Sequence, residues 1–461
     1  MLALDDTIAA ISTPLGEGGI GIVRMSGADA LGIVRGFFVP GRYAALPATP
    51  PTFVPHRLTY GHVVDPTTDK AVDEVLIAYM PAPYTYTRQD VVEINCHGGV
   101  VPLRRVLELC LRAGARLAEP GEFTLRAFLN GRIDLAQAEA VLGIVQARTE
   151  AGLRLAIDQL DGRLSQEIRQ VRAELVDLLA WLEAAIDFAE DEVPERDVGP
   201  DLQVVRERLE QLLASADQGI IYRHGLRTAI VGRPNVGKSS LLNALLRTSR
   251  AIVTPIPGTT RDTLEETLNL RGVPLVLVDT AGIRAASDDL VERLGIERSQ
   301  AALATADLAL LVVDGSEPLT TADRDIAALV GDKTALVVVN KNDLPAATEA
   351  QDLLPPCPHL HVSALTGQGL EALEAAIVET IFAGQVIASD ALLVSSPRHK
   401  EAIGRALDHV AAAQDTLAQG LPADFVSIDV TGAVNALGEV TGETAHEDML
   451  AAIFGRFCVG K

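Results

Sequence analysis

Residues 232–239 read Gly-Arg-Pro-Asn-Val-Gly-Lys-Ser, directly after an apolar run typical of a buried strand and before a helix-like run. A glycine-rich turn at this place is the arrangement of a P-loop, in which Gly232 and Gly237 let backbone N–H groups surround phosphates. Lys238 would reach the β- and γ-phosphates, and the Ser239 hydroxyl would bind Mg²⁺. The stretch therefore predicts a nucleoside triphosphate site.

Two further motifs follow predicted strands and indicate a guanine nucleotide. In the first, residues 279–282, the Asp279 carboxylate can hold Mg²⁺ through water and the Gly282 N–H can contact the γ-phosphate. In the second, residues 340–343, the Asp343 carboxylate can accept hydrogen bonds from N1–H and the 2-amino group of guanine, neither of which adenine offers. We therefore expect an enzyme that hydrolyses GTP to GDP and phosphate.

Between the P-loop and residues 279–282, residues 258–262 predict a mobile switch loop that supplies a second Mg²⁺ ligand, Thr260. The residue after Gly282 is Ile283, which cannot orient an attacking water as the glutamine of many regulatory GTPases does. Another polar group must do so, and nearby candidates are Arg284, Asp288, Asp289, Glu292 and Arg293. The residues predicted to contact GTP are Asn235, Val236, Gly237, Lys238, Ser239, Ser240, Thr254, Pro255, Ile256, Pro257, Gly258, Thr259, Thr260, Asp279, Thr280, Ala281, Gly282, Asn340, Lys341, Asp343, Ser363 and Ala364.

The composition sets the context for this site. A chain of 461 residues is expected to form about three domains. Its 48% hydrophobic and 22% charged residues fit a soluble globular protein, and no signal peptide or spanning helix is expected. The four cysteines lack zinc-ligand spacing, so reduced thiols in a cytoplasm are expected, and the tail after Cys458 does not fit prenylation. The net charge of −23 disfavours non-specific binding to a polyanion.

The sequence pattern that predicts secondary structure changes several times along the chain. Residues 1–120 are predicted to be mixed α/β, with strands at 20–23 and 74–78 and a helix at 101–113. Residues 133–190 are predicted to form long amphipathic helices because apolar residues recur every three to four positions, at Leu153, Ile157, Leu160, Leu164 and Ile168. A further helix is expected at 202–218, strands at 227–231, 274–278, 308–313 and 334–339, and later helices at 398–419, 427–441 and 446–457.

We therefore expect an α/β multidomain protein in which a doubly wound, Ras-like G domain is inserted into a helical domain. The expected divisions are an N-terminal α+β domain, the first part of the helical domain, the G domain and the second part of the helical domain, at residues 1–121, 122–222, 223–384 and 385–461.

With these motifs in place, the whole chain resembles the MnmE (TrmE) family of tRNA-modification GTPases. The resemblance rests on seven short stretches: Gly18-Gly-Ile-Gly-Ile-Val-Arg24; Asp90-Val-Val-Glu93 with His97-Gly-Gly99; Pro120-Gly-Glu-Phe123 with Arg126-Ala-Phe-Leu-Asn130; Gly258-Thr-Thr-Arg-Asp262; and the terminal Phe457-Cys-Val-Gly-Lys461.

The resemblance implies a GTPase that dimerises and is activated by potassium. The K⁺ ligands of the family correspond to Asn235 and to the loop residues Thr254, Ile256 and Thr259. A K⁺ there would neutralise charge that develops between the phosphates. Glu292 matches the glutamate that orients the hydrolytic water, although one residue is inserted before it, and so would act where Ile283 cannot.

The resemblance also implies an N-terminal domain that binds 5-formyl-tetrahydrofolate or a related one-carbon folate. The matching positions are Arg24, Glu93, Arg132 and Lys461. A carboxylate can accept hydrogen bonds from the pterin, while Arg and Lys can pair with the glutamyl carboxylates.

The family acts with a flavin-dependent partner, MnmG (GidA), in a heterotetramer. Together they place an aminomethyl or carboxymethylaminomethyl group on C5 of the wobble uridine, position 34, of certain tRNAs. The acidic charge fits a division of labour in which the partner holds much of the tRNA. No membrane anchoring is implied, and Cys458 is not expected to be catalytic.

Two alternatives stay open at this point. A ribosome-assembly GTPase shares the P-loop Asn and the switch motif, but it predicts a basic RNA-binding module, where this chain has an acidic helical region. A switch or scaffold with negligible turnover would hydrolyse GTP equally slowly in KCl and NaCl.

Overall fold

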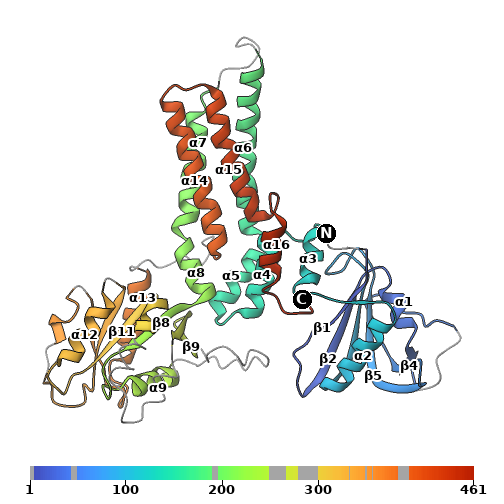
Figure 1. Cartoon of the computed structure of the whole chain (residues 1–461), viewed down its shortest axis with the longest axis horizontal. Helices are drawn as coiled ribbons and strands as arrows, with labels where there is room; N and C mark the ends of the chain where they lie inside the picture. The colour runs from blue at the N-terminus through green and yellow to red at the C-terminus, as the bar shows by residue number, and fades with distance from the viewer. Residues whose placement is uncertain are drawn as a thin grey trace. The chain divides into compact units, whose positions relative to one another are not determined.

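The fold is given by a computed structural model that describes residues 5–42, 49–188, 196–248, 266–278, 300–331, 333–347, 350–355, 357–382 and 394–461. The chain packs as two compact units, residues 1–142 with 438–461 and residues 143–437. The boundaries between them fall within helices α4 (Leu135–Gln146) and α15 (Ala423–Thr441). Each unit is described by itself, with the elements labelled as in Figure 1.

The first unit is built on a seven-stranded sheet with the order β3-β4-β5-β6-β2-β1-β7. Neighbouring strands are antiparallel except for β1 and β7, which run parallel. The expected strands at 20–23 and 74–78 are confirmed within longer ones. The strands are β1 (Ile8–Ile11), β2 (Gly18–Ser26), β3 (Phe38–Pro40), β4 (Leu58–Asp65), β5 (Lys70–Met80), β6 (Val91–Gly98) and β7 (Arg116–Leu117).

Helices α1 (Ala30–Arg35) and α2 (Val100–Arg112) cover one face of this sheet, as Figure 1 shows. The predicted helix at 101–113 is thus confirmed, shifted by one residue. Its apolar residues recur at helical spacing, and Leu103, Val106 and Cys110 are buried against the sheet. The opposite side of the helix is charged, so burial of one stripe fixes how α2 lies.

The two ends of the first unit meet at α3 (Glu122–Leu129) and α16 (Glu447–Phe454), where Leu125, Leu135 and Phe454 share an apolar cluster. Gly121 precedes α3 with φ of 71°, and a Cβ there would lie 2.6 Å from the carbonyl oxygen of Phe454. Only glycine fits this close approach. The tail then forms a β-bridge with Pro120, which brings the C-terminus to the sheet.

A buried group of charges joins α3 to the first strand. Arg126 is almost fully buried, and its guanidinium pairs with the carboxylates of Asp6 and Glu122. Arg116 approaches the same two carboxylates from β7. Burial tends to raise the pKa of Asp6 and Glu122, but the hydrogen bonds and charges of the two arginines outweigh it and hold both pKa values below their ordinary ranges.

The second unit contains a six-stranded sheet with the order β13-β12-β11-β8-β10-β9. The four predicted strands are confirmed, and their runs of Val, Leu and Ile are buried as expected for a parallel sheet. Two strands were not predicted, β13 and the antiparallel edge strand β9. The strands are β8 (Leu226–Val231), β9 (Glu266–Leu270), β10 (Val273–Val278), β11 (Leu308–Asp314), β12 (Ala335–Asn340) and β13 (His359–His361).

Helices α9, α12 and α13 pack against this sheet, and two apolar clusters fill its two faces. One cluster contains residues of α9 and α13, and the other contains residues of α12, so the helices lie on both faces. This matches the predicted doubly wound architecture. The helices are α9 (Lys238–Thr248), α12 (Thr321–Val330) and α13 (Leu370–Phe382).

The rest of the second unit is helical, and Figure 1 shows α6, α7, α14 and α15 side by side as a bundle. Helix α7 precedes the sheet in sequence and packs on α14, which follows the sheet. The helices are α5 (Glu150–Leu160), α6 (Arg163–Asp187), α7 (Gly199–Ala214), α8 (Ala216–His224) and α14 (Pro397–Ala418), with α15. The described helices include none both long and apolar enough to cross a membrane.

The helices predicted between residues 133 and 190 are confirmed as α4, α5 and α6, but the apolar positions from Leu153 to Ile168 do not all face a core. Helix α5 ends at Leu160 and α6 begins at Arg163, so these apolar positions do not lie along one helix. Leu153 and Ile157 are exposed, because α5 buries its other face. On α6 the prediction holds, since Leu164 and Ile168 are buried. The single helix expected at 202–218 is likewise two helices, α7 and α8, which meet at Ser215.

Candidate functional site

The predicted P-loop lies between β8 and α9, at the carboxyl end of a central strand. Gly237 has φ of 96°, and a Cβ there would lie 2.2 Å from Nδ2 of Asn340. Asn235 has φ of 65°, a conformation that asparagine tolerates better than most residues. The loop therefore turns back on itself tightly, with its backbone close to the strand that carries the guanine motif.

Lys238 opens α9, and its side chain lies across the loop. Its ammonium donates hydrogen bonds of 2.7 Å to the carbonyl oxygens of Gly232 and Arg233. Burial lowers the pKa of Lys238 from 10.5 to about 8. Phosphate oxygens would restore the lost solvation of this charge, so the site favours an anionic ligand. Ser239 and Ser240 follow in the first turn of α9.

The guanine motif begins where β12 ends. Nδ2 of Asn340 donates to the carbonyl oxygen of Val236 in the P-loop at 2.9 Å, and its Oδ1 accepts from the N–H of Ala364 at 3.0 Å. One buried amide thus joins the P-loop and the residues predicted to contact guanine. The Ser363 hydroxyl donates to Oδ1 of Asp343 at 2.6 Å, which orients the carboxylate.

Asp314 is a residue of this region that the sequence analysis missed. It ends β11, and its side chain is 2% exposed. Its Oδ2 lies 2.6 Å from Nζ of Lys341. Burial tends to raise the pKa of Asp314, but Lys341 and the hydrogen bonds from Ser316 outweigh burial and hold the pKa below its ordinary value. The available signal was its position, since polar residues at the carboxyl ends of parallel strands gather at one edge.

Several predicted site residues lie outside the described residues. They are Thr254, Pro255, Ile256, Pro257, Gly258, Thr259, Thr260, Asp279, Thr280, Ala281, Gly282 and Glu292. The described part of the site is therefore the P-loop, the first turn of α9 and the two guanine-facing loops.

The first unit brings together all four residues predicted to bind a folate. Arg24 on β2 and Glu93 on β6 are cross-strand partners, and Arg24 Nε donates to Glu93 Oε1 at 2.8 Å. Nη1 of Arg24 also lies 3.4 Å from the carbonyl oxygen of Gly460, next to Lys461. Burial lowers the pKa of Lys461, and the positive charge of Arg24 lowers it further.

Arg132 reaches the same region through Tyr86, which the sequence analysis missed. The Arg132 guanidinium lies 4.8 Å from the centre of the Tyr86 ring and donates to the Tyr86 carbonyl oxygen at 3.1 Å. Burial raises the pKa of Tyr86, while the charges of Arg132 and Arg24 act in the opposite direction. Each arginine therefore lies against an aromatic ring, since the Arg24 guanidinium lies 5.8 Å from the centre of the Phe123 ring. The sequence carries no local signal for Tyr86.

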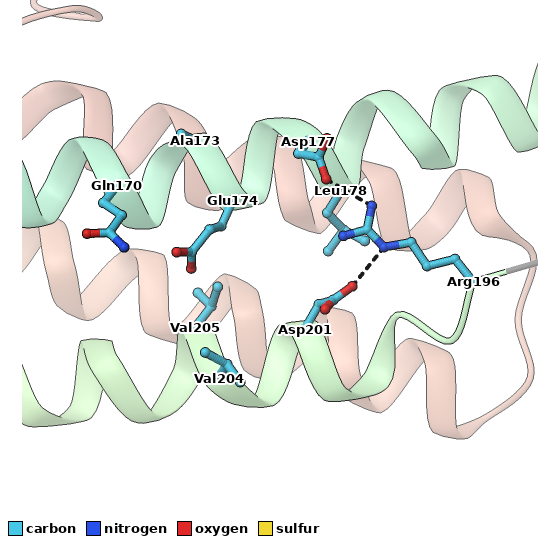
Figure 2. A pocket seen from close by; sticks show the side chains of 9 residues that line it. All are labelled: Gln170, Ala173, Glu174, Asp177, Leu178, Arg196, Asp201, Val204 and Val205. Atoms are coloured by element: carbon cyan, nitrogen blue, oxygen red, sulfur yellow. Dashed lines mark hydrogen bonds and ion pairs between the residues drawn. The ribbon is translucent and has the colours of Figure 1, made fainter.

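A separate hollow lies between α6 and α7, lined by the residues shown in Figure 2. Arg196 spans it, with Nη1 3.0 Å from Asp177 Oδ2 and Nε 2.8 Å from Asp201 Oδ2. Glu174 is paired with Arg208 at 2.7 Å. Because arginines already neutralise these carboxylates, we interpret the hollow as a braced helix–helix contact rather than a cation site.

Comparison with known proteins finds family models that match both the N-terminal region and the rest of the chain. Residues 135–458 match the family model described as the MnmE helical domain, and residues 7–132 match the one described as the GTP-binding protein TrmE N-terminus. Three similar proteins are named tRNA modification GTPase MnmE. Those of Roseiflexus castenholzii, Chloroflexus aurantiacus and Alkaliphilus oremlandii are 53%, 51% and 50% identical over 99% of this chain and 99%, 100% and 100% of their own lengths.

Proposed function

The chain belongs to the MnmE family of tRNA modification GTPases, and we propose that its GTP hydrolysis is activated by potassium and serves the modification of C5 of the wobble uridine, position 34, in certain tRNAs. The observation that supports the GTP site is the contact between the P-loop and the guanine loops. Asn340 bonds to Val236 on one side and to Ala364 on the other. The phosphate and base sites therefore share one edge of the sheet.

In this proposal the backbone of residues 235–240 surrounds the phosphates, and Lys238 pairs with the β- and γ-phosphates. Asp343 reads the guanine edge, held by the Ser363 hydroxyl. Mg²⁺, with Ser239 and Thr260 as ligands, and K⁺, with Asn235, Thr254, Ile256 and Thr259, would neutralise phosphate charge when bound. Glu292 would orient the water.

Base recognition is tested by Asp343→Asn, assayed by equilibrium binding of GDP and XDP. Xanthine carries a carbonyl where guanine carries the 2-amino group, so an amide N–H can replace the carboxylate. We expect GDP affinity to fall roughly 100-fold, as for a lost charge-assisted pair, while XDP affinity rises. Asp352→Asn, an exposed change in the same unit, is the control. Equal GDP affinity in wild type and Asp343→Asn would rule out this site.

For the first unit we propose binding of 5-formyl-tetrahydrofolate or a related one-carbon folate. The support is the pairing of Arg24 with Glu93, the contact of Arg24 with Gly460 next to Lys461, and the contact of Arg132 with Tyr86, whose pKa is raised by burial but lowered by both arginines. Titrating 5-formyl-tetrahydrofolate into wild type and Glu93→Ala tests it, with the exposed Glu108→Ala as control. We expect binding to weaken only in Glu93→Ala, and undiminished affinity there would refute the placement.

We further propose a homodimer that joins the MnmG (GidA) flavoprotein as a heterotetramer in the cytoplasm, with tRNA held largely by the partner. The net charge of −23 supports this division, because phosphate contacts need Lys and Arg. A pull-down from a cell extract tests it through the flavin absorbance of the captured protein. If the captured proteins contain no flavin, the proposed partnership with the flavoprotein is wrong.

The four-part division at residues 1–121, 122–222, 223–384 and 385–461 also remains our proposal, with the G domain as an insertion. It is supported by the packing of α7 on α14. Beside it, the N–H of Val394 lies 3.4 Å from the Ser215 hydroxyl, and Lys400 pairs with Asp217 at 2.6 Å. The chain therefore returns to the bundle close to where it left.

A further inference from the structure

The segment that leaves β11 carries three carboxylates that face the nucleotide motifs. We call Asp314, Glu317 and Asp323 the acidic bracket. Asp314 ends β11, Glu317 lies in the following turn and Asp323 lies in the first turn of α12. A cationic side chain from each nucleotide motif pairs with these carboxylates. Lys341 of the guanine motif pairs with Asp314, and Arg233 of the P-loop pairs with Glu317 and Asp323.

At the guanine end the bracket is rigid. Oδ1 of Asp314 accepts hydrogen bonds from the N–H and the hydroxyl of Ser316, at 2.9 and 2.6 Å, which leaves Oδ2 to the Lys341 ammonium. The backbones are joined as well, because the Gly315 N–H donates to the carbonyl oxygen of Asn340 at 2.8 Å. Lys341 itself has φ of 65°, so its side chain leaves a sharply turned loop.

At the phosphate end the Arg233 guanidinium pairs with Glu317 Oε2 and lies 3.4 Å, Nε to Oδ1, from Asp323. Asp323 is held in place because its Oδ2 accepts from the N–H and the hydroxyl of Thr320, in a capping box. The carbonyl oxygen of the same Arg233 accepts the Lys238 ammonium. Arg233 thus links the phosphate-binding lysine to the bracket.

We propose that Asp314 and Arg233 are positioning residues: one end of the acidic bracket fixes the loop that carries Asp343, and the other fixes the P-loop backbone that carries Lys238. The inference rests on the proposed assignment of the P-loop and of Asp343. Neither residue touches the nucleotide: Asp314 acts through Lys341, two residues before Asp343, and Arg233 acts through the backbone that carries Lys238.

The two ends of the bracket should have different effects on base selectivity. IDP lacks the 2-amino group of GDP, so the ratio of GDP to IDP affinity reports how well Asp343 is aligned with the base. Releasing Lys341 loosens the loop that carries Asp343, which lowers the ratio. Releasing Arg233 moves the P-loop, which both nucleotides contact alike, so the ratio stays the same. A general loss of stability would also leave the ratio unchanged.

Asp314→Asn keeps the shape of the side chain and removes its charge. With fluorescent GDP and IDP and the full chain, we expect GDP affinity to fall about tenfold, as for the loss of one charge-assisted pair, and the GDP-to-IDP ratio to fall at least about threefold. Asp307→Asn is the matched control at the other end of β11, where Asp307 Oδ2 accepts from the Arg227 N–H at 3.0 Å. Its ratio should equal that of wild type.

Arg233→Gln should weaken GDP and IDP binding by the same factor, about three- to tenfold. It should raise KM for GTP while changing kcat less than twofold, because saturating nucleotide restores the loop. Arg233→Lys should rescue only in part, since an ammonium cannot bridge Glu317 and Asp323 as a planar fork does.

Folded Asp314→Asn with a wild-type GDP-to-IDP ratio would overturn the role of Asp314, and unchanged GDP affinity in Arg233→Gln would overturn that of Arg233. Thermal unfolding of each variant shows whether it is folded. A failure of the proposed site is seen separately, because Asp343→Asn would then keep its affinity for GDP.

Discussion

At the scale of single residues, the pKa of the Lys238 ammonium should depend on whether a phosphate is bound. Burial lowers its pKa to about 8 in the absence of phosphate, whereas bound phosphate stabilises the ammonium and raises the pKa. Binding therefore takes up a proton near and above pH 8, so GDP affinity should be nearly full at pH 7, about twofold weaker at pH 8 and about tenfold weaker at pH 9.

Titration of GDP affinity between pH 7 and 9 measures this effect. Lys238→Arg is the control, because a guanidinium stays charged over the range and the variant retains any titration of the nucleotide itself. An equal change of GDP affinity with pH in wild type and Lys238→Arg would show that Lys238 does not titrate between pH 7 and 9.

Arg126 tests the buried charges of the first unit. Arg126→Met should cost about 3 kcal/mol of stability, because Glu122 loses a buried partner. Arg112→Met, which breaks an exposed pair with Glu108, should cost less than about 1 kcal/mol. Hydrogen exchange of β1 and α3 is the readout, since Trp181, the single tryptophan, lies on α6 of the other unit. Equal protection in both variants would contradict the account.

The same network should respond to pH with a definite sign. The folded pKa values of Asp6 and Glu122 lie below their ordinary 3.8 and 4.5, so their contribution is present above about pH 4.5 and is lost as the pH falls through the folded values. The stability difference between wild type and Arg126→Met should therefore shrink below pH 4. This stability difference is measured by urea unfolding between pH 7 and pH 3, with hydrogen exchange as the probe. A stability difference that stays constant with pH would show that Asp6 and Glu122 do not couple stability to pH.

At the scale of elements, Gly121 decides whether α3 and α16 can meet. A methyl group there would strike the carbonyl oxygen of Phe454, so Gly121→Ala should push α16 away and carry Lys461 with it. We expect faster hydrogen exchange over residues 447–461 and weaker folate binding. Gly41→Ala has a comparable positive φ of 75° and no described atom within 4 Å of the added methyl group, so it separates backbone strain from the clash. Similar exchange in both variants would sink this explanation.

The strands that carry the nucleotide motifs could be predicted from the sequence, because buried parallel strands are continuous apolar runs such as 308–313. The edge strand β9 was missed, since half-polar runs such as Glu266–Leu270 pair only where a neighbouring strand offers an edge. The break between α5 and α6 was also missed, because apolar residues on both sides happened to continue one helical period.

At the scale of the whole molecule, the four predicted folate residues were found on resemblance and are brought together by the fold. Their neighbours could not be predicted, because Tyr86 meets Arg132, and Asp314 meets Lys341, only after distant segments have packed. Sequence motifs name the groups that would contact a ligand. The groups that hold them depend on tertiary structure.

The most direct test of the central claim is the rate of GTP hydrolysis by the full chain in KCl and in NaCl at equal ionic strength. We expect a rate at least roughly tenfold higher in KCl, because a bound K⁺ would be an added charge partner for the transition state. Asn235→Gly removes the proposed K⁺ ligand without straining the positive φ at that position, so it should abolish the difference while GDP still binds. Equal, very slow rates in both salts for the wild-type chain would contradict the account.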